Sequence, residues 1–302
     1  MNAATPPRTF DPQILAGKRI LITGGGTGLG KGVARKLVEH GAQVHLWGRR
    51  DAVLAEAVGE VSEGYAGSAH FQAVDVRRAE DVDAAVGEIW ETHGPITGLI
   101  NNAAANFIAP TKSLSPRAFE AVTSTVMHGS FNTTHACGKR WIDQELPGSV
   151  VSSLTTWVWS GSAFVTPSAM AKAAVHAMTM SLAVEWGRYG IRLNAIAAGP
   201  IPTDYAWEML NPTSKSSVGA TQADQVPLGR FGTIEELANL DIFLLSDACN
   251  YLTGHTIAMD GGQHLAGPGT FAGLTSLTDE DWAEVRASSQ AASAASKAAR
   301  SV

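Results

Sequence analysis

The sequence has little cysteine, no excess of positive charge and no long apolar run. Its two cysteines, Cys137 and Cys249, lie far apart within helical patterns, so they indicate neither a disulfide framework nor a metal site. The formal net charge is −6 and no basic stripe is present, which disfavours a nucleic-acid partner. No segment has the roughly 20 apolar residues of a membrane span, and the start of the sequence lacks the pattern of a signal peptide. We therefore expect a cytoplasmic protein with neither a metal nor a membrane partner.

The sequence does contain short apolar runs that alternate with helical patterns. Apolar residues make up 45% of the 302 residues, which is enough for a substantial core. Because parallel strands are joined by right-handed crossovers through helices, this alternation predicts an α/β fold with a doubly wound parallel sheet and helices on both faces. The expected strands cover residues 18–23, 43–47, 70–74, 98–100, 150–151, 191–196 and 256–259.

Composition divides the chain into an arm, one domain and an extension. Residues 1–16 are aperiodic and contain proline and threonine, which is typical of a flexible arm. Residues 17–265 hold the α/β domain, and residues 266–302 form an extension whose Ala- and Ser-rich end is expected to be poorly ordered. Inside the domain, residues 203–228 form one long irregular connection, and such loops often cover a site.

A glycine-rich turn follows the first expected strand and precedes a helix. Glycines let the backbone turn tightly and approach a pyrophosphate, whose charge then lies at the helix N-terminus. An ordinary glycine-rich turn is the alternative, but the order of strand, turn and helix favours a dinucleotide site. The cofactor contacts expected in this turn are Gly24, Gly26, Thr27, Gly28, Leu29 and Gly30.

The end of the second expected strand indicates which dinucleotide would bind. An NAD-binding unit usually has an acidic residue there, but this corner reads Gly48-Arg49-Arg50. A guanidinium group forms charge-assisted hydrogen bonds with a 2′-phosphate, so Arg49 favours NADP(H). The alternative is that both arginines are simply solvated at the end of a strand.

One lysine stands out in the helical pattern of residues 167–188. Ser168 and Lys172 are four positions apart, so they share a helix face and could line one pocket. A buried amine costs free energy unless its charge is used. This pair is therefore a candidate for a reactive centre beside the cofactor.

Several motifs together resemble those of the short-chain dehydrogenase/reductase superfamily. They are Thr23-Gly24-x-x-x-Gly28-x-Gly30, Asp75-Val76, Asn101-Asn102-Ala103, Lys172, Gly199-Pro200-Ile201-x-Thr203 and Asp260-Gly261-Gly262. The resemblance implies a single Rossmann-type sheet of seven strands and assembly as a homotetramer or homodimer. It adds to the expected NADP(H) contacts Asp75, Val76, Asn102, Ala103, Lys172, Gly199, Pro200, Ile201 and Thr203.

One departure from the superfamily pattern changes the expected chemistry. The superfamily normally has Tyr-x-x-x-Lys, in which the tyrosine transfers a proton to a carbonyl oxygen, whereas this chain has Ser168 before Lys172. A serine hydroxyl is a poor acid, so simple alcohol or ketone chemistry is disfavoured. The sequence is similar to 2,4-dienoyl-CoA reductases, which also lack this tyrosine, through residues 24–31, 101–107, 114–116, 167–172 and 185–190.

That similarity implies an enzyme of fatty acid metabolism, in which NADPH reduces the conjugated diene of an acyl-CoA thioester. Four residues then match catalytic positions of the subfamily. Asn106 matches the residue that binds the thioester oxygen, and Lys172 matches the one that holds the nicotinamide ribose. Thr155 matches a hydroxyl near the catalytic serine position, and Ser168 matches a serine of the subfamily.

The remaining matches concern the acyl-CoA. Arg77 matches a position near the CoA phosphates, and Phe107 and Ser115 match acyl-CoA contacts. Trp157 stands where the mitochondrial-type reductase has a tyrosine that helps to bind the thioester oxygen, and Met209 replaces a CoA-binding arginine. An indole N–H donates one hydrogen bond, but it is not a usable acid.

Two other function classes stay open. One is an oxidoreductase acting on a cyclic, steroid-like or carbonyl/alcohol substrate, which would need another acid such as His128 or Tyr205. The other is a catalytically silent NADP(H)-binding protein. Aromatic residues that could line an acyl or ring pocket, or simply pack in the core, are Trp157, Trp159, Phe164 and Trp207.

Overall fold

The computed structural model describes residues 10–65, 68–106, 108–203, 223–266, 278–281 and 283–284. Contacts divide the chain into two compact units, Met1–Gly262 and Gln263–Val302. The first unit contains the sheet, and the second begins with the short helix α10 (Gln263–Ala266). Leu15, within the predicted N-terminal arm, is fully buried in the core of the first unit.

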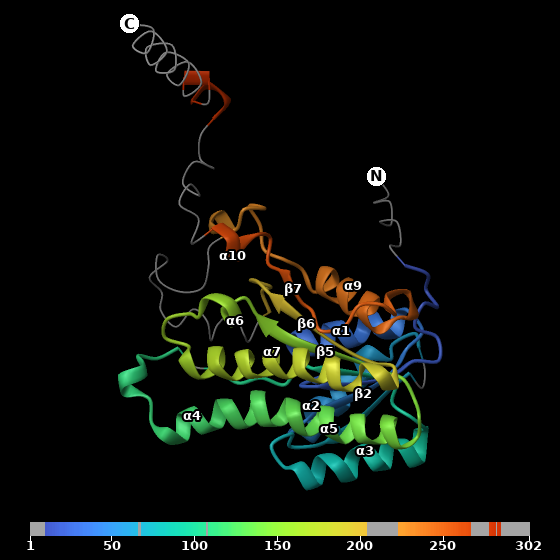
Figure 1. Ribbon diagram of the computed structural model, residues 1–302. Coiled ribbons are helices and arrows are strands. Elements are labelled where there is room, and N and C mark those ends of the chain that lie inside the picture. The colour runs from blue at the N-terminus through green and yellow to red at the C-terminus, as the bar shows by residue number, and fades with distance from the viewer. Residues whose placement is uncertain are drawn as a thin grey trace, which may run out of the picture. The chain divides into compact units, whose positions relative to one another are not determined.

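Seven parallel strands form one sheet (Figure 1). Their order is β3-β2-β1-β4-β5-β6-β7, so the chain crosses to the other side of β1 when it enters β4. Open α/β sheets bind ligands at such a switch point, beyond the carboxyl ends of the strands. The predicted α/β, doubly wound, seven-stranded architecture is confirmed. The strands are β1 (Arg19–Thr23), β2 (Gln43–Gly48), β3 (Ala69–Ala73), β4 (Gly98–Asn101), β5 (Gly148–Thr155), β6 (Ile191–Ala198) and β7 (Thr256–Met259).

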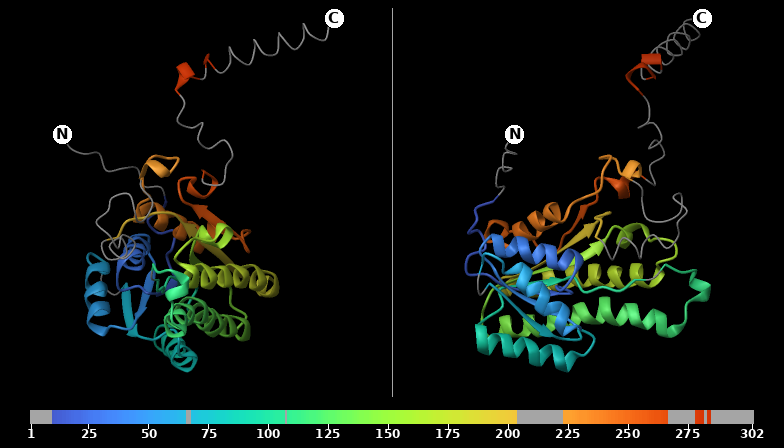
Figure 2. Two further views of the ribbon diagram at one scale, coloured as in Figure 1. Left: turned by 90° about the vertical axis from the view of Figure 1, so that its left-hand side faces the viewer. Right: turned by 180° about the vertical axis from the view of Figure 1, so that it is seen from behind.

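Helices cover both faces of this sheet. Figure 2 shows α1, α2 and α9 on one face and α3, α5 and α7 on the other. Because side chains alternate along a strand, Ile20 and Ile22 of β1 join the core beneath α1 and α9, whereas Leu21 joins the opposite core. The helices are α1 (Gly28–Glu39), α2 (Asp51–Val61), α3 (Ala79–His93), α4 (Pro116–Thr123), α5 (Gly129–Asp143), α6 (Trp157–Ser160), α7 (Thr166–Trp186) and α9 (Ile234–Leu245).

Strand β5 is longer than its apolar pattern predicted. The sequence indicated only residues 150–151, but the strand is paired with β6 along its whole length. Hydrogen bonds satisfy the serines that extend it: Ser149 Oγ donates to the carbonyl oxygen of Leu244 at 3.0 Å, and Ser152 Oγ accepts from Asn101 Nδ2 at 3.4 Å. Buried polar side chains with such partners are stable in a strand, yet hydrophobic periodicity does not detect them.

Capping residues begin two of the helices. Ser115 Oγ accepts a hydrogen bond from the Ala118 amide at 3.1 Å at the start of α4, and Thr233 forms a capping box with Glu236 at the start of α9. Between α4 and α5, residues Ser124–His128 form a π-helical turn. None of the helices in the described ranges combines the length and hydrophobicity needed to cross a membrane.

Candidate active site

The turn between β1 and α1 has a backbone that only glycine accommodates easily. Gly24 and Gly28 have positive φ values of +67° and +52°. A Cβ atom on Gly30 would lie 2.4 Å from the carbonyl oxygen of Gly24, too close for any side chain. Thr27 precedes α1 in an extended conformation and its side chain does not cap the helix. The amides at the start of α1 therefore remain available to an anion such as a pyrophosphate.

Hydrogen bonds fix the glycine turn against the end of β4. Thr23 Oγ1 accepts from the backbone amides of Asn102 and Ala103, both at 3.0 Å. Asn102 Nδ2 donates in return to the carbonyl oxygens of Thr23 at 3.1 Å and Gly24 at 3.2 Å. Two predicted contacts, Asn102 and Ala103, thus lie beside the turn. The role of Thr23 as their anchor was not predicted, because nothing in the sequence links strand β1 to residues so distant.

The loop after β6 forms another wall of the same region. A Cβ atom on Gly199 would lie 2.6 Å from Asp260 Cα, so this glycine permits a close backbone approach. The carbonyl oxygen of Pro200 accepts from the Gly232 amide at 3.1 Å, which holds the loop. Thr203 Oγ1 lies 3.6 Å from the position of a Cβ atom on Gly28. The loop and the glycine turn therefore meet, as a shared dinucleotide site requires.

Three charged residues gather beyond the carboxyl ends of β2 and β3. Arg77 Nε donates to Asp75 Oδ1 at 2.8 Å, and its Nη2 donates to Oδ2 at 2.5 Å. The hydrogen bonds from Arg77 lower the pKa of Asp75, and the charge of Arg49 lowers it further. Arg49 itself is exposed, so its guanidinium group is accessible to a ligand.

Lys172 is buried on α7, with its amine directed at β5. Lys172 Nζ donates to the carbonyl oxygen of Ser153 at 2.7 Å, and the residue is only 8% exposed. Burial lowers the pKa of Lys172 to about 8, because the charged amine loses hydration. Ser168, one turn earlier on the same helix, is also buried.

Two further half-buried residues each have one buried polar atom without a hydrogen-bond partner. Asn106 Oδ1 follows β4, Thr155 Oγ1 ends β5, and neither atom has a hydrogen bond. These strands are neighbours in the sheet, so both residues lie at the same carboxyl edge. An unsatisfied buried polar atom costs about 1–3 kcal/mol, and such atoms in a native fold commonly face a ligand or water.

Sequence comparison then places this arrangement in a family. A family model described as Enoyl-(Acyl carrier protein) reductase matches residues 24–264. The chain is a short-chain dehydrogenase/reductase. The motif-based assignment is therefore confirmed, and the chain belongs to a family of oxidoreductases that use nicotinamide cofactors.

The alignments of this short-chain dehydrogenase/reductase with individual relatives cover nearly the full length of each relative. A Bacillus subtilis protein named as a probable 2,4-dienoyl-CoA reductase is 43% identical over 249 residues, covering 82% of this chain and 97% of that protein. The crystal structure of a short chain dehydrogenase from Bacillus anthracis has 42% identity and a TM-score of 0.74, covering 82% of this chain and 96% of that one. A Burkholderia cenocepacia gluconate 5-dehydrogenase, solved in complex with NADP and tartrate, has 28% identity and a TM-score of 0.73, covering 83% and 97%.

The other predicted site residues of this short-chain dehydrogenase/reductase differ in burial and in hydrogen bonding. Trp157 is half-buried at the start of α6, close in sequence to Thr155. The side chain of Ser115 is engaged as the cap of α4, and His128 is exposed on the π-helical turn. The described ranges do not include Phe107, Tyr205 and Trp207, which were expected to contribute, or Met209 and the rest of residues 204–222 in the long connection.

Two aromatic side chains of the predicted pocket are largely exposed. Trp159 is 44% exposed and Phe164 is 55% exposed, so neither packs in the core. Phe164 has a φ of +64°, which is unfavourable for a residue with a side chain, and its carbonyl oxygen accepts from the Ala109 amide at 2.9 Å. This bond joins the segment before α7 to the segment that follows Asn106.

Proposed function

We propose that this short-chain dehydrogenase/reductase uses NADPH to reduce the conjugated C=C bond of an acyl-CoA thioester, as 2,4-dienoyl-CoA reductases do. The observation that carries the proposal is the Thr155 hydroxyl, whose buried Oγ1 has no hydrogen-bond partner and which ends the strand whose Ser153 carbonyl oxygen accepts from the buried Lys172. Ser168 stands where a carbonyl reductase needs a tyrosine. The similarity to the Bacillus subtilis protein supports the same substrate class.

The residues present fit a nicotinamide dinucleotide. The open amides at the start of α1 suit the pyrophosphate, and the exposed Arg49 suits a 2′-phosphate. Lys172 would hold the nicotinamide ribose. When bound, NADPH would supply the hydride. A solved relative contains NADP, which agrees with this choice of cofactor.

The chain's own groups would stabilise the charge that develops after hydride addition. Electron density moves along the conjugated system to the thioester oxygen, where the Asn106 amide and the Thr155 hydroxyl can donate hydrogen bonds. The Trp157 indole N–H offers a third donor from the start of α6. Lys172 adds a positive charge nearby. Water can then protonate carbon, so the reaction needs no acidic side chain, whereas reduction of an isolated carbonyl would.

The direct test is NADPH oxidation by the purified protein with a 2,4-dienoyl-CoA, followed at the cofactor absorbance. A 3-ketoacyl-CoA of equal chain length serves as the matched carbonyl substrate. We expect turnover of the diene and little of the ketone, with an enoyl-CoA product identified by mass. Turnover of the ketone alone would contradict the proposal. No turnover of either, with NADPH binding intact, would favour a silent binding protein.

A second candidate is reduction of a cyclic or aromatic substrate. The exposed rings of Trp159 and Phe164, and Trp157 in place of the subfamily tyrosine, favour it. Preference for a ring-bearing enone over any acyl-CoA in the same assay would support this alternative.

Assembly as a homotetramer or homodimer and a cytoplasmic location stay predictions.

Arg49→Asp should reverse the preference between the two nicotinamide cofactors. Loss of a charge-assisted bond to the 2′-phosphate costs about 1.5–3 kcal/mol, so kcat/KM with NADPH should fall about tenfold to a hundredfold. The ratio of kcat/KM for NADPH to that for NADH measures this effect. Arg78→Asp is the matched control, because Arg78 is 71% exposed and pairs with Asp81. An unchanged ratio in Arg49→Asp would show that another group binds the 2′-phosphate.

Activity should also depend on the charge of Lys172. Because burial lowers the pKa of Lys172 to about 8, the amine is charged below pH 8 and neutral above it. In the proposed mechanism kcat/KM should therefore be level below pH 8 and fall about tenfold per pH unit above it. Lys172→Arg stays charged throughout, so any residual activity should lack this decline. The same decline in Lys172→Arg would assign the titration to another group.

A further inference from the structure

A short helix follows β5 directly and carries two tryptophans that were expected at the active site. Helix α6 consists of the four residues Trp157–Ser160 and begins two residues after Thr155, whose buried Oγ1 has no hydrogen-bond partner. Its backbone bonds include one from the Gly161 amide to the Trp157 carbonyl oxygen at 2.9 Å. A helix of one turn is not stable by itself. Contacts with the rest of the fold must therefore hold α6 in place.

Helix α6 lies against α7 (Figure 1), and two of its side chains make the contact. Val158 packs against a buried cluster that includes Val175 of α7. Trp159 meets His176, the next residue of α7, edge to face, with ring centroids 6.4 Å apart and ring planes at 79°. Edge-to-face rings at such separations attract each other through their quadrupoles. Neighbouring residues of α6 thus contact neighbouring residues of α7.

The ring of His176 is itself held by the sheet. His176 Nδ1 and Thr256 Oγ1 share a hydrogen bond of 2.8 Å. Thr256 begins β7, which pairs with β6. Both residues are half-buried, so this bond is partly shielded from water. The ring of His176 therefore connects the sheet to Trp159, and the hydrogen bond restricts its rotation.

These contacts determine which way Trp157 faces. Successive residues of an α-helix are about 100° apart around the helix axis. Val158 and Trp159 both face α7, so Trp157 lies on the far side of the turn, roughly 150° from the direction midway between them. Because α6 follows the carboxyl end of β5, the Trp157 indole lies at the same edge of the sheet as the Thr155 hydroxyl.

We propose that His176 is a positioning residue for the candidate active site: through Trp159 it holds α6 and so orients the Trp157 indole. The inference rests on the function proposed above, in which that indole donates a hydrogen bond to the thioester oxygen. His176 acts through α6 and is assigned no contact with the substrate or the cofactor. The sequence did not indicate this role, because nothing in it links a helical histidine to an earlier tryptophan and to a threonine on a distant strand.

The first test is hydrogen exchange of the full chain, measured by mass spectrometry and independent of turnover. His176→Ala removes both the ring contact and the hydrogen bond, so peptides that contain residues 157–161 should exchange about tenfold faster. Thr256→Val keeps the shape of the side chain and loses only the hydrogen bond, so the same peptides should exchange about threefold faster. His135→Ala, at an exposed position of α5, is the matched control and should leave them unchanged.

Two exchange results would overturn the proposal. One is unchanged exchange of α6 in both His176→Ala and Thr256→Val. The other is an increase shared by all of α7, because His176 would then only stabilise the fold.

The second test uses turnover of a 2,4-dienoyl-CoA. In His176→Ala, kcat/KM for the thioester should fall about tenfold, whereas NADPH affinity and the decline above pH 8 that we assign to Lys172 should not change. In a chain that already carries Trp157→Phe, His176→Ala should lower kcat/KM by less than about twofold, because the indole that it orients is gone. An equal fall in both backgrounds would overturn the proposal. A wild type without turnover would refute the proposed function alone, and the exchange of α6 would then decide the role of His176.

Discussion

Replacing Lys172 with methionine should lower kcat for NADPH-dependent reduction about a hundredfold to a thousandfold, the usual effect of removing one group that stabilises transition-state charge. The buried amine donates at 2.7 Å to the carbonyl oxygen of Ser153, two residues before Thr155, whose Oγ1 lacks a partner. Methionine keeps the length of the side chain but carries no charge. The loss should therefore appear mainly in kcat, measured in stopped-flow single turnovers with saturating NADPH.

A control separates loss of this charge from general loss of stability. Lys139→Met removes a lysine whose amine pairs with Asp83 on α3, at the surface, and it should retain full activity. Melting temperatures and NADPH affinities of both variants show whether they fold and bind. If Lys172→Met turns over at the wild-type rate, Lys172 has no role in the chemistry and the mechanism proposed above is wrong.

Asp241→Asn should stabilise the protein, and more so as the pH rises. Asp241 lies on α9 in the core, is 3% exposed, and its Oδ1 has no hydrogen-bond partner. Burial raises the pKa of Asp241 to about 8, from an ordinary value of 3.8 in the unfolded chain. Between these values the folded chain holds a proton that the unfolded chain has released. The wild type therefore loses stability as the pH rises through this range, by about 1.4 kcal/mol per pH unit.

The quantity to measure is the difference in unfolding free energy between the Asp241→Asn variant and the wild type. Asparagine has nearly the same shape as aspartate and does not titrate, so the gap in unfolding free energy should widen from pH 5 to pH 8. Urea denaturation at several pH values gives this gap directly. Asp143→Asn, at an exposed position at the end of α5, should show no such trend. A gap for Asp241→Asn that is constant with pH would mean that the carboxylate is ionised in the folded chain.

Local patterns in the sequence determined the fold and the glycine turn at which we propose that the cofactor binds. Apolar runs alternating with helical patterns specify a parallel sheet covered on both faces, because each strand must be buried and each crossover needs a helix. The glycine turn was equally clear, since positive φ at Gly24 and Gly28 and the contact at Gly30 permit little else. The capping interactions of Ser115 and Thr233 are local in the same way, since each joins residues three positions apart.

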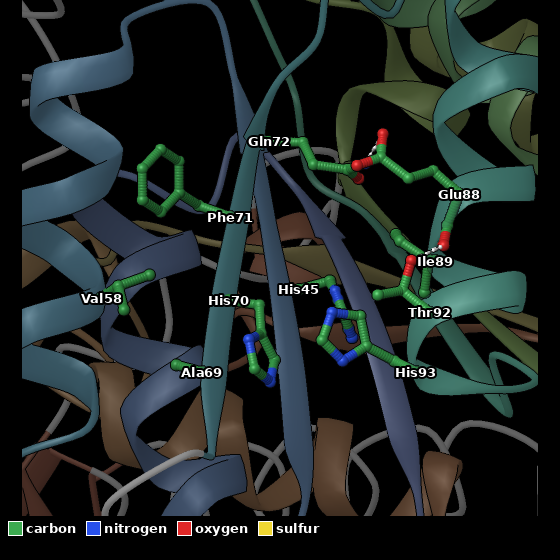
Figure 3. A pocket seen from close by; sticks show the side chains of 10 residues that line it. All are labelled: His45, Val58, Ala69, His70, Phe71, Gln72, Glu88, Ile89, Thr92 and His93. Atoms are coloured by element: carbon green, nitrogen blue, oxygen red, sulfur yellow. Dashed lines mark hydrogen bonds between the residues drawn. The ribbon is translucent and has the colours of Figure 1, made fainter.

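Tertiary structure alone decided which groups meet. The bond from Lys172 to Ser153, the bonds from the Asn102 and Ala103 amides to Thr23, and the burial of Asp241 Oδ1 without a partner depend on how elements pack. The contacts among the rings of His45, His70 and His93 (Figure 3) depend on the register of β2 with β3 and on where α3 ends. Periodicity in a sequence reports which face of an element is buried, but not which residue of another element lies opposite. Contact, and hence the chemistry of a side chain, is therefore a property of the folded chain.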